Sequence, residues 1–219
     1  LLIDGGPSRR ALSDGLGRRL PLGNRQLDWL VIAGTGEEQI GGLVPTLDRF
    51  EVENVLWAGP QGGSYAAREL QSHLLNAEIP VEKAEAGQVL DLGDGAALTV
   101  LEVGQRGAVL LLEWGNFRAL LPIGLDFELL SNLESRPDLK GLTALMLAES
   151  GYAPVNPAEW IDALGPRMIL LSVGAGDRDG LPSPETLAAV EGYTLLRTDH
   201  NGWIQLSTDS EQLWVEVER

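Results

Sequence analysis

The stretch VIAGTGEEQIGGL, from Val31 to Leu43, joins a buried strand to the start of a helix. The apolar run LDWLVIA at residues 27–33 is typical of a strand buried on both faces. The segment IGGL at residues 40–43 begins a run with apolar side chains at helical spacing. The turn between them contains glycines, a threonine, two glutamates and a glutamine, but no histidine or cysteine. A strand, a tight turn and a helix in this order predict an α/β unit.

Composition describes an ordinary folded chain. Of its 219 residues, 44% are hydrophobic and 22% are charged, which is typical of soluble globular domains. We find no linker, repeat or low-complexity run, so residues 1–219 are expected to form a single domain. No apolar stretch approaches the ~20 residues of a membrane helix, and we expect no membrane insertion. No signal peptide opens the chain, and its strand-like start, LLID, is expected of a fragment of something larger.

Charge and residue usage exclude several functions. The formal net charge of −16 repels phosphate backbones, so DNA binding is expected to be weak or absent. Cysteine is absent and His73 and His200 are the only histidines. A dinuclear zinc hydrolase site is built mostly from imidazole groups. Two histidines cannot build one, and neither has the motif context of a Ser-His-Asp arrangement.

Strand-like and helix-like segments alternate along the chain and predict an α/β or α+β fold with two sheets. A meander of antiparallel type is expected where short strands follow one another between glycine-containing turns. Strands are predicted at 1–4, 27–33, 55–58, 81–83, 88–92, 97–103, 108–114, 118–123, 143–147, 167–173, 193–197, 203–207 and 213–217, and helices at 8–20, 40–50, 64–76, 126–133, 157–164 and 183–190.

Three further stretches carry a family resemblance. They are IDGGPSRRALSDGLGRRLP at residues 3–21, LSVGAGDRDGLPSPETL at 171–187 and YTLLRTDHNGWIQLSTD at 193–209. With the opening stretch, they resemble the C-terminal metallo-β-lactamase-like domain of the ComEC family of competence DNA-uptake proteins. The resemblance implies an α+β, four-layer αββα sandwich with two mixed sheets flanked by helices. The family domain usually begins one hairpin earlier, which leaves open whether an N-terminal hairpin is missing here.

The resemblance also assigns the metal-ligand positions, and they hold unsuitable residues. The histidine-rich turn reads Gly34, Gly36, Glu38 and Gln39. The metal-bridging aspartate falls on Gly124, with Asp126 two residues late. Glu149 and Ser150 stand at a histidine pair, and Leu181 at a late histidine. The resemblance therefore implies a degenerate domain without catalytic residues, metal or zinc pair, in which Asp4 still braces the turn through backbone hydrogen bonds.

The residues leave an active alternative open. If the fold is as implied, Glu38, Glu149, Asp177 and Asp179 would lie around the old pocket, and four carboxylates could hold Ca²⁺ or Mg²⁺. The chain would then be a metal-dependent phosphodiesterase or nuclease. Acids are so abundant in this sequence that a coincidental grouping is the favoured interpretation.

Other candidate features have ordinary structural interpretations. Ser64 follows two glycines and could hold an anion at a helix N-terminus, although a helix cap explains it. The helical arginines Arg9, Arg10, Arg18 and Arg19 do not form one stripe, and a solvated surface is favoured over a single-strand binding site. The resemblance implies a structural or interaction role in a soluble, extracytoplasmic domain beside a membrane channel region of the same parent chain.

Overall fold

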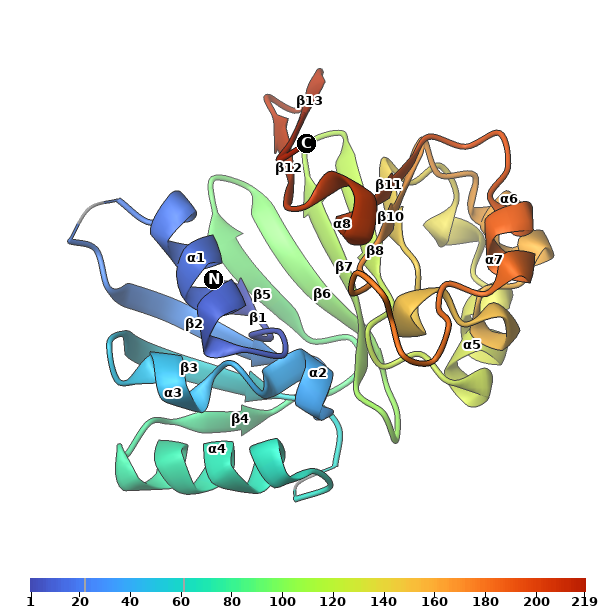
Figure 1. Ribbon diagram of the computed structural model, residues 1–219. Helices are drawn as coiled ribbons and strands as arrows, with labels where there is room; N and C mark the ends of the chain where they lie inside the picture. Colours follow the sequence, from blue (N-terminus) through green and yellow to red (C-terminus); the bar gives the residue numbers. More distant parts are fainter. Residues whose placement is uncertain (22, 61) are drawn as a thin grey trace. The chain divides into compact units, whose positions relative to one another are not determined.

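The computed structural model describes residues 1–21, 23–60 and 62–219 (Figure 1). The chain forms two compact units. The first contains Leu1–Ala86 and Val103–Ala108, and the second contains Gly87–Glu102 and Val109–Arg219. Each unit has its own sheet and core and is described by itself. That residues 1–219 act as a single domain stays a prediction.

The first unit contains a four-stranded sheet in the order β1-β2-β3-β4. All three pairings are parallel, so the expectation that both main sheets are mixed is wrong for this one. The segment Val81–Lys83 was expected in the meander, but it pairs with β3. Helix-containing connections join β2 to β3 and β3 to β4, as parallel neighbours require. The strands are β1 (Leu2–Ile3), β2 (Gln26–Ile32), β3 (Glu51–Trp57) and β4 (Val81–Lys83).

Helices cover this sheet with apolar side chains. They are α1 (Arg9–Arg19), α2 (Glu37–Ile40), α3 (Val44–Leu47) and α4 (Tyr65–Asn76). The helix expected at residues 40–50 is interrupted, because α2 ends at Ile40 and α3 begins only at Val44. Between them the Gly42 N–H donates to the Gly6 carbonyl oxygen at 2.8 Å, and a Cβ atom at Gly42 would come within 2.7 Å of the Gly5 carbonyl oxygen. Ser8 and Ser64 accept hydrogen bonds from Ala11 and Ala67, so both predicted caps are present.

The second unit contains a seven-stranded sheet in the order β11-β10-β9-β8-β7-β6-β5. Antiparallel pairs β5–β6 and β7–β8 confirm most of the predicted meander, and strands β8 to β11 pair in parallel. This sheet is mixed, as expected. The strands are β5 (Val89–Gly93), β6 (Ala96–Val103), β7 (Ala108–Trp114), β8 (Phe117–Leu121), β9 (Ala144–Met146), β10 (Met168–Leu171) and β11 (Leu195–Arg197).

Apolar helix faces and the sheet form the main core of the second unit, which includes the buried Trp160, Ile161 and Leu133. A separate antiparallel hairpin, β12 (Ile204–Thr208) with β13 (Leu213–Val217), follows β11. No helix in the described residues is long and apolar enough to cross a bilayer. The helices of this unit are α5 (Phe127–Glu134), η1 (Pro137–Leu139), η2 (Glu149–Gly151), η3 (Ala153–Val155), α6 (Ala158–Leu164), α7 (Pro184–Ala189) and α8 (Thr198–Asn201).

Candidate functional site

The turn after β2 is closed by main chain. Gly34, at the first assigned ligand position, is buried and forms an isolated antiparallel bridge with Gly107. Next to it, the Ala108 N–H donates to the Ala33 carbonyl oxygen at 2.7 Å. The backbone of the segment Val103–Ala108 therefore lies directly against the turn.

Two glycines, Gly107 and Gly59, make this approach possible. Gly107 has a φ of +142°, and a Cβ atom there would strike the Ala33 carbonyl oxygen and come within 3.1 Å of the Gly34 Cα atom. Gly59, with a φ of +83°, follows β3 and also lies close to Gly107: a Cβ atom on it would be 3.2 Å from the Gly107 Cα atom. Backbone fills the space in which larger side chains at these positions would begin.

The Asp4 side chain binds the backbone of the same turn. Its Oδ1 atom accepts hydrogen bonds from the Ala33 N–H at 2.8 Å and the Gly34 N–H at 3.3 Å. The side chain is buried and its backbone is left-handed, with a φ of +52°. Burial raises the pKa of Asp4 to about 7, against the lowering effect of the two backbone hydrogen bonds. The carboxyl group thus supports the turn through hydrogen bonds, in the manner expected from the resemblance.

The other assigned positions of the turn are at least partly accessible to solvent, whereas Thr35 is buried. Gly36 and Glu38 are exposed and Gln39 is half-buried, and the Gln39 amide oxygen lies where a Cβ atom on Gly36 would be. The neighbouring Glu37 has a structural role that the sequence interpretation missed. Its Oε1 atom accepts a hydrogen bond from the Ala66 N–H at 2.9 Å.

Glu37 also bears on the anion hypothesis for Ser64. The Ser64 hydroxyl accepts from the Ala67 N–H and donates to the Thr35 carbonyl oxygen. With the Ala66 N–H bound to Glu37, a carboxylate already stands at the N-terminus of α4, where it interacts favourably with the helix dipole. These contacts therefore make Ser64 a helix cap. The Glu37 carboxylate occupies the position at the N-terminus of α4 where an anion would bind.

In the second unit, the residues after β8 form a buried turn into α5. Gly124 is buried, and Asp126 caps α5 by accepting hydrogen bonds from the Glu128 and Leu129 N–H groups. The Asp126 carboxylate is used as a helix cap, two positions beyond the assigned bridging aspartate. Gly124 itself brings no donor side chain.

The loop after β9 has an unusual backbone. Glu149, Ser150 and Gly151 are consecutive left-handed residues, with φ values of 46°, 51° and 84°. The Asn156 side chain, 1% exposed, holds this loop: its amide accepts from the Ala148 N–H and donates to the Ala148 and Tyr152 carbonyl oxygens. Sequence interpretation missed Asn156, whose buried role no motif signals.

The same loop is fastened to the segment that begins at Leu181. The Gly151 carbonyl oxygen accepts from the Thr186 hydroxyl at 2.7 Å and the Ser183 N–H at 3.1 Å. Leu181 is half-buried and packs against the main core of the unit, as an apolar side chain would. The structure therefore brings together the loop of Glu149 and the segment of Leu181, two of the assigned regions.

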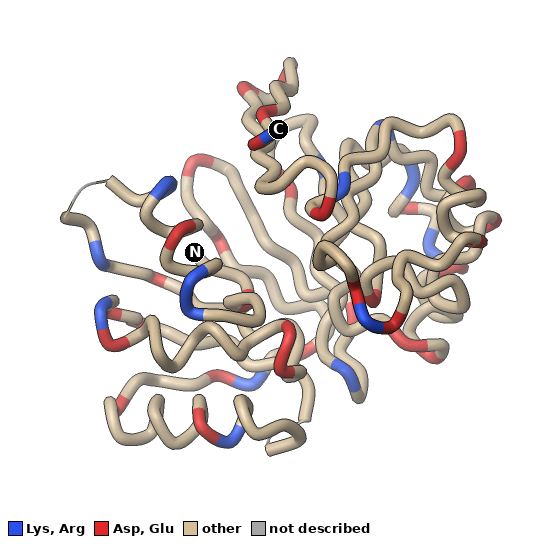
Figure 2. The backbone as a smooth tube through the Cα atoms, viewed as in Figure 1, with Lys and Arg blue, Asp and Glu red and all other residues tan. Residues whose placement is uncertain are grey.

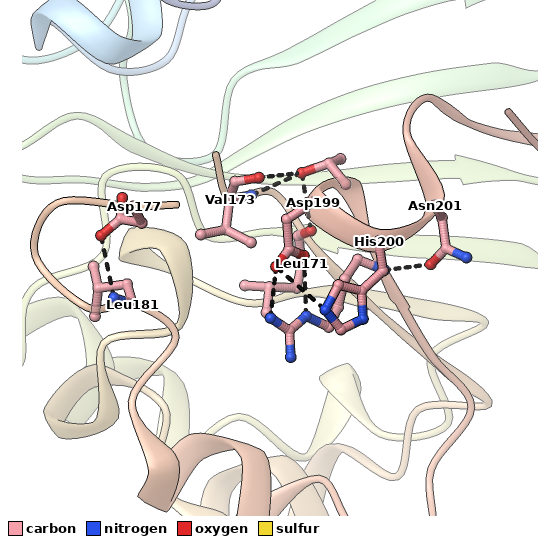
Figure 3. A network of polar contacts seen from close by, with 9 residues as sticks. Leu171, Val173, Asp177, Leu181, Asp199, His200 and Asn201 are labelled. Atoms are coloured by element: carbon pink, nitrogen blue, oxygen red, sulfur yellow. Dashed lines mark hydrogen bonds and ion pairs between the residues drawn. The ribbon is translucent and has the colours of Figure 1, made fainter. Parts of the chain in front are cut away.

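Asp177 and Asp179 belong to the loop before Leu181. The Asp177 Oδ1 atom accepts a hydrogen bond from the Leu181 N–H at 3.1 Å (Figure 3). It also accepts one from the Asp179 N–H at 2.9 Å. Asp179 is exposed. These bonds give Asp177 a turn-forming role in its loop.

The RTD motif after β11 forms a polar network in the second unit (Figure 3). Arg197 and Asp199 make a two-pronged ion pair, with N–O distances of 3.0 and 2.7 Å. This pair, assisted by nearby His200, lowers the pKa of the Asp199 carboxyl group. The Thr198 hydroxyl accepts from the Val173 N–H and donates to the Val173 carbonyl oxygen, each at 2.8 Å. The network ties β11 to the residues that follow β10.

The four arginines of α1 lie at the two ends of the helix. Arg9 and Arg10 stand at the start of α1 and Arg18 and Arg19 at its end, all of them exposed. Acidic positions are interspersed with basic ones along the chain (Figure 2). Arg10 lies 3.9 Å from Asp14 of the same helix. This distribution does not favour a continuous track for a phosphate backbone.

The donor set does not fit a zinc pair. Within residues 1–21, 23–60 and 62–219, no three His, Cys, Asp or Glu side chains gather into a group that could hold a metal ion. Glycine offers no side-chain donor, and Leu181 is apolar. Glu38, Gln39 and Glu149 carry side-chain oxygens, but no histidine or cysteine stands at an assigned position, and in the described residues these oxygens do not gather into the three- or four-ligand set that a zinc ion requires.

Solved structures share this fold at low sequence identity. Zn²⁺-bound PqqB from Methylobacterium extorquens superposes with a TM-score of 0.58 at 9% identity, covering 89% of this chain and 80% of PqqB. The metallo-β-lactamase fold protein YhfI from Bacillus subtilis gives 0.58 at 13% identity, covering 98% of this chain and 86% of YhfI.

CmlA, a diiron β-hydroxylase from Streptomyces venezuelae, gives a TM-score of 0.52 at 15% identity, covering 82% of this chain and 44% of CmlA. No protein-family model and no curated protein matches the sequence. The chain has the metallo-β-lactamase fold, as the family resemblance implied.

Proposed function

We propose that this chain is a metallo-β-lactamase-fold domain without metal-dependent hydrolysis, with a structural or interaction role in a ComEC-like DNA-uptake protein. The observation that carries the proposal is the main-chain closure at Gly34. Gly34 supplies no ligand atom at the first assigned position, and its main chain is bridged to Gly107. Loss of the ligands and closure of the turn are thus mutually consistent.

The finer part of the proposal rests on the SVGAG…PSPE and RTD…G stretches. Residues of both make structural contacts: Thr198 of the second binds Val173 of the first, and Asp177 shapes the loop before Leu181. These contacts supply a physical reason to keep such motifs in a domain without catalysis. In a ComEC-like parent, a soluble extracytoplasmic domain beside the channel region of the same chain is the proposed setting.

Metal binding tests the first part. We expect calorimetric titration with zinc, manganese and calcium to give no saturable isotherm in the micromolar range. A nuclease assay on single- and double-stranded DNA with added manganese is expected to show no cleavage. The decisive pair is wild type against Glu38→Ala, because Glu38 is the exposed carboxylate at an assigned ligand position. Cleavage by wild type that Glu38→Ala abolishes would establish the phosphodiesterase or nuclease alternative.

The cellular role needs a separate test. In cells that carry the natural gene, deletion of residues 1–219 is expected to lower uptake of labelled DNA. The Glu38→Ala substitution is expected to leave uptake unchanged. Normal uptake after the deletion would refute the DNA-uptake role without touching the conclusion on metal binding.

A further inference from the structure

The hairpin of β12 and β13 leaves one strand open. These two strands form a sheet of their own, which packs through Leu206 and Leu213 against a small core of Ala119, Ala144 and Met168. The centre of β13 is exposed, with Trp214 at 48% and Val215 at 40%. Free strand edges in native proteins are usually shortened, charged or interrupted by proline. The sequence LWVEV has no proline, and Glu216 is its one charged residue.

The register shows which backbone groups face the open edge. Ile204 lies opposite Val217, and the Glu218 N–H donates to the Trp203 carbonyl oxygen at 3.1 Å. In an antiparallel ladder, residues that bond across the pair alternate with residues that point away. The N–H and C=O groups of Leu213, Val215 and Val217 therefore point away from β12, and no other strand in the described part of the chain pairs with β13.

The two faces of β13 differ in chemistry. Leu213, Val215 and Val217 form an apolar face, whereas Trp214 and Glu216 share the opposite one. From Trp203 to Glu218 the hairpin contains four carboxylates and no lysine or arginine. A strand added beside β13 would therefore meet apolar side chains on one face, and a carboxylate and an indole on the other. An arginine or lysine suits both of the latter.

We propose that β13 is a docking edge for an extended peptide segment that alternates apolar and basic residues, added to the hairpin as a third strand. Main-chain hydrogen bonds to Val215 provide the attachment, and the two faces select the side chains, as in other strand-addition complexes. The proposed partner is thus a segment of another protein that is positively charged and binds in an extended conformation. This site is independent of the turn at Gly34 and goes beyond the proposed function.

A binding titration tests the proposal with the full chain. The probe is a short synthetic peptide of alternating valine and arginine, and binding is followed by fluorescence anisotropy of a label on the peptide. We expect saturable binding that weakens as salt is added. A peptide with glutamate for arginine, and one with N-methylated backbone along its pairing edge, are expected not to bind.

Substitutions at Val215 separate strand addition from nonspecific attraction. Val215→Pro removes an N–H that points away from β12, so the hairpin is retained while the docking edge is blocked. Val215→Thr keeps the N–H and is the matched control. We expect Val215→Pro to weaken binding at least about tenfold and Val215→Thr to bind like wild type, with unchanged circular dichroism for both. The Glu216→Lys variant should bind the glutamate peptide more tightly than the arginine peptide.

Three results would overturn the proposal. Equal binding by wild type and Val215→Pro would show that the edge is not used. Absence of binding by wild type would exclude this peptide chemistry. Self-association in sedimentation that Val215→Pro abolishes would assign the edge to a second copy of this chain. None of these results bears on metal binding, so they are distinguishable from failure of the proposed function.

Discussion

Replacing Gly107 by alanine should destabilise the first unit strongly. The new Cβ atom would strike the Ala33 carbonyl oxygen, so the segment Val103–Ala108 must move away from the turn. The unfavourable backbone conformation costs about 1–3 kcal/mol, the overpacking about 1–3 kcal/mol, and the lost Ala108-to-Ala33 hydrogen bond about 1 kcal/mol. We expect a total loss on the order of 4 kcal/mol.

A matched glycine isolates the close approach. Gly95 also has a positive φ, of +79°, but a Cβ atom there would meet no atom within 4 Å. Gly95→Ala should therefore cost only about 1–2 kcal/mol, from the backbone conformation alone.

Thermal unfolding followed by circular dichroism measures the difference between these variants. For a chain of this length, each kcal/mol shifts Tm by roughly 2–4 °C, so Gly107→Ala should melt about 10 °C below wild type. Faster hydrogen exchange at the Ala108 amide should accompany the shift. Equal Tm values for Gly107→Ala and Gly95→Ala would refute the argument that main-chain contact closes the turn.

Three further substitutions, and Glu38→Ala as a matched control, test the contacts around the assigned positions. Burial raises the pKa of Asp4 from 3.8 to about 7, so the folded state holds a proton that the unfolded chain releases, and the free energy of unfolding should fall as pH rises from about 4 to 7. Asp4→Asn keeps the oxygen acceptor and should flatten this pH dependence in urea titrations. An unchanged slope would assign the pH dependence to other groups. Asn156→Ala should lower the free energy of unfolding by about 2–4 kcal/mol, because buried backbone groups lose their hydrogen-bond partners. Hydrogen exchange should accelerate in the loop at residues 147–156, and protection equal to wild type would contradict the role of this amide. Glu37→Ala should lower the free energy of unfolding by about 0.5–1 kcal/mol, because the Ala66 N–H loses its acceptor. Glu38→Ala, at an exposed position, should leave the free energy of unfolding unchanged. A larger loss for Glu38→Ala than for Glu37→Ala would show that Glu38 makes the stabilising contact.

The elements that the sequence predicted best are those in which local and long-range forces agree. The run at residues 27–33 is a strand because it is apolar and buried in the sheet, and Ser8 and Ser64 begin helices as their side chains dictate. The helix at 40–50 failed because spacing alone does not reveal that Gly41 and Gly42 touch the backbone of a distant segment. The strand at Val81 was assigned to the wrong sheet, since a three-residue strand has no signal for its partner.

The candidate site shows the same division. The residues at the assigned ligand positions follow directly from the sequence, and the buried Asp4 lies where the resemblance implies. Gly107 and Asn156 were not foreseen, because their importance comes from contacts with residues distant in the sequence or from burial without a motif. Glycine in a hairpin loop and asparagine in a polar loop look alike whether or not they are essential.

The division of the chain into units has a consequence for its biosynthesis. Residues 1–86 leave the ribosome before the segment Val103–Ala108, yet that later segment completes their unit. Until it arrives, the Ala33 carbonyl oxygen lacks its partner from Ala108, and the turn at Gly34 has no bridge. A truncated chain ending at Ala86 should therefore be a target for proteases, whereas one extended through Ala108 contains every residue of the first unit.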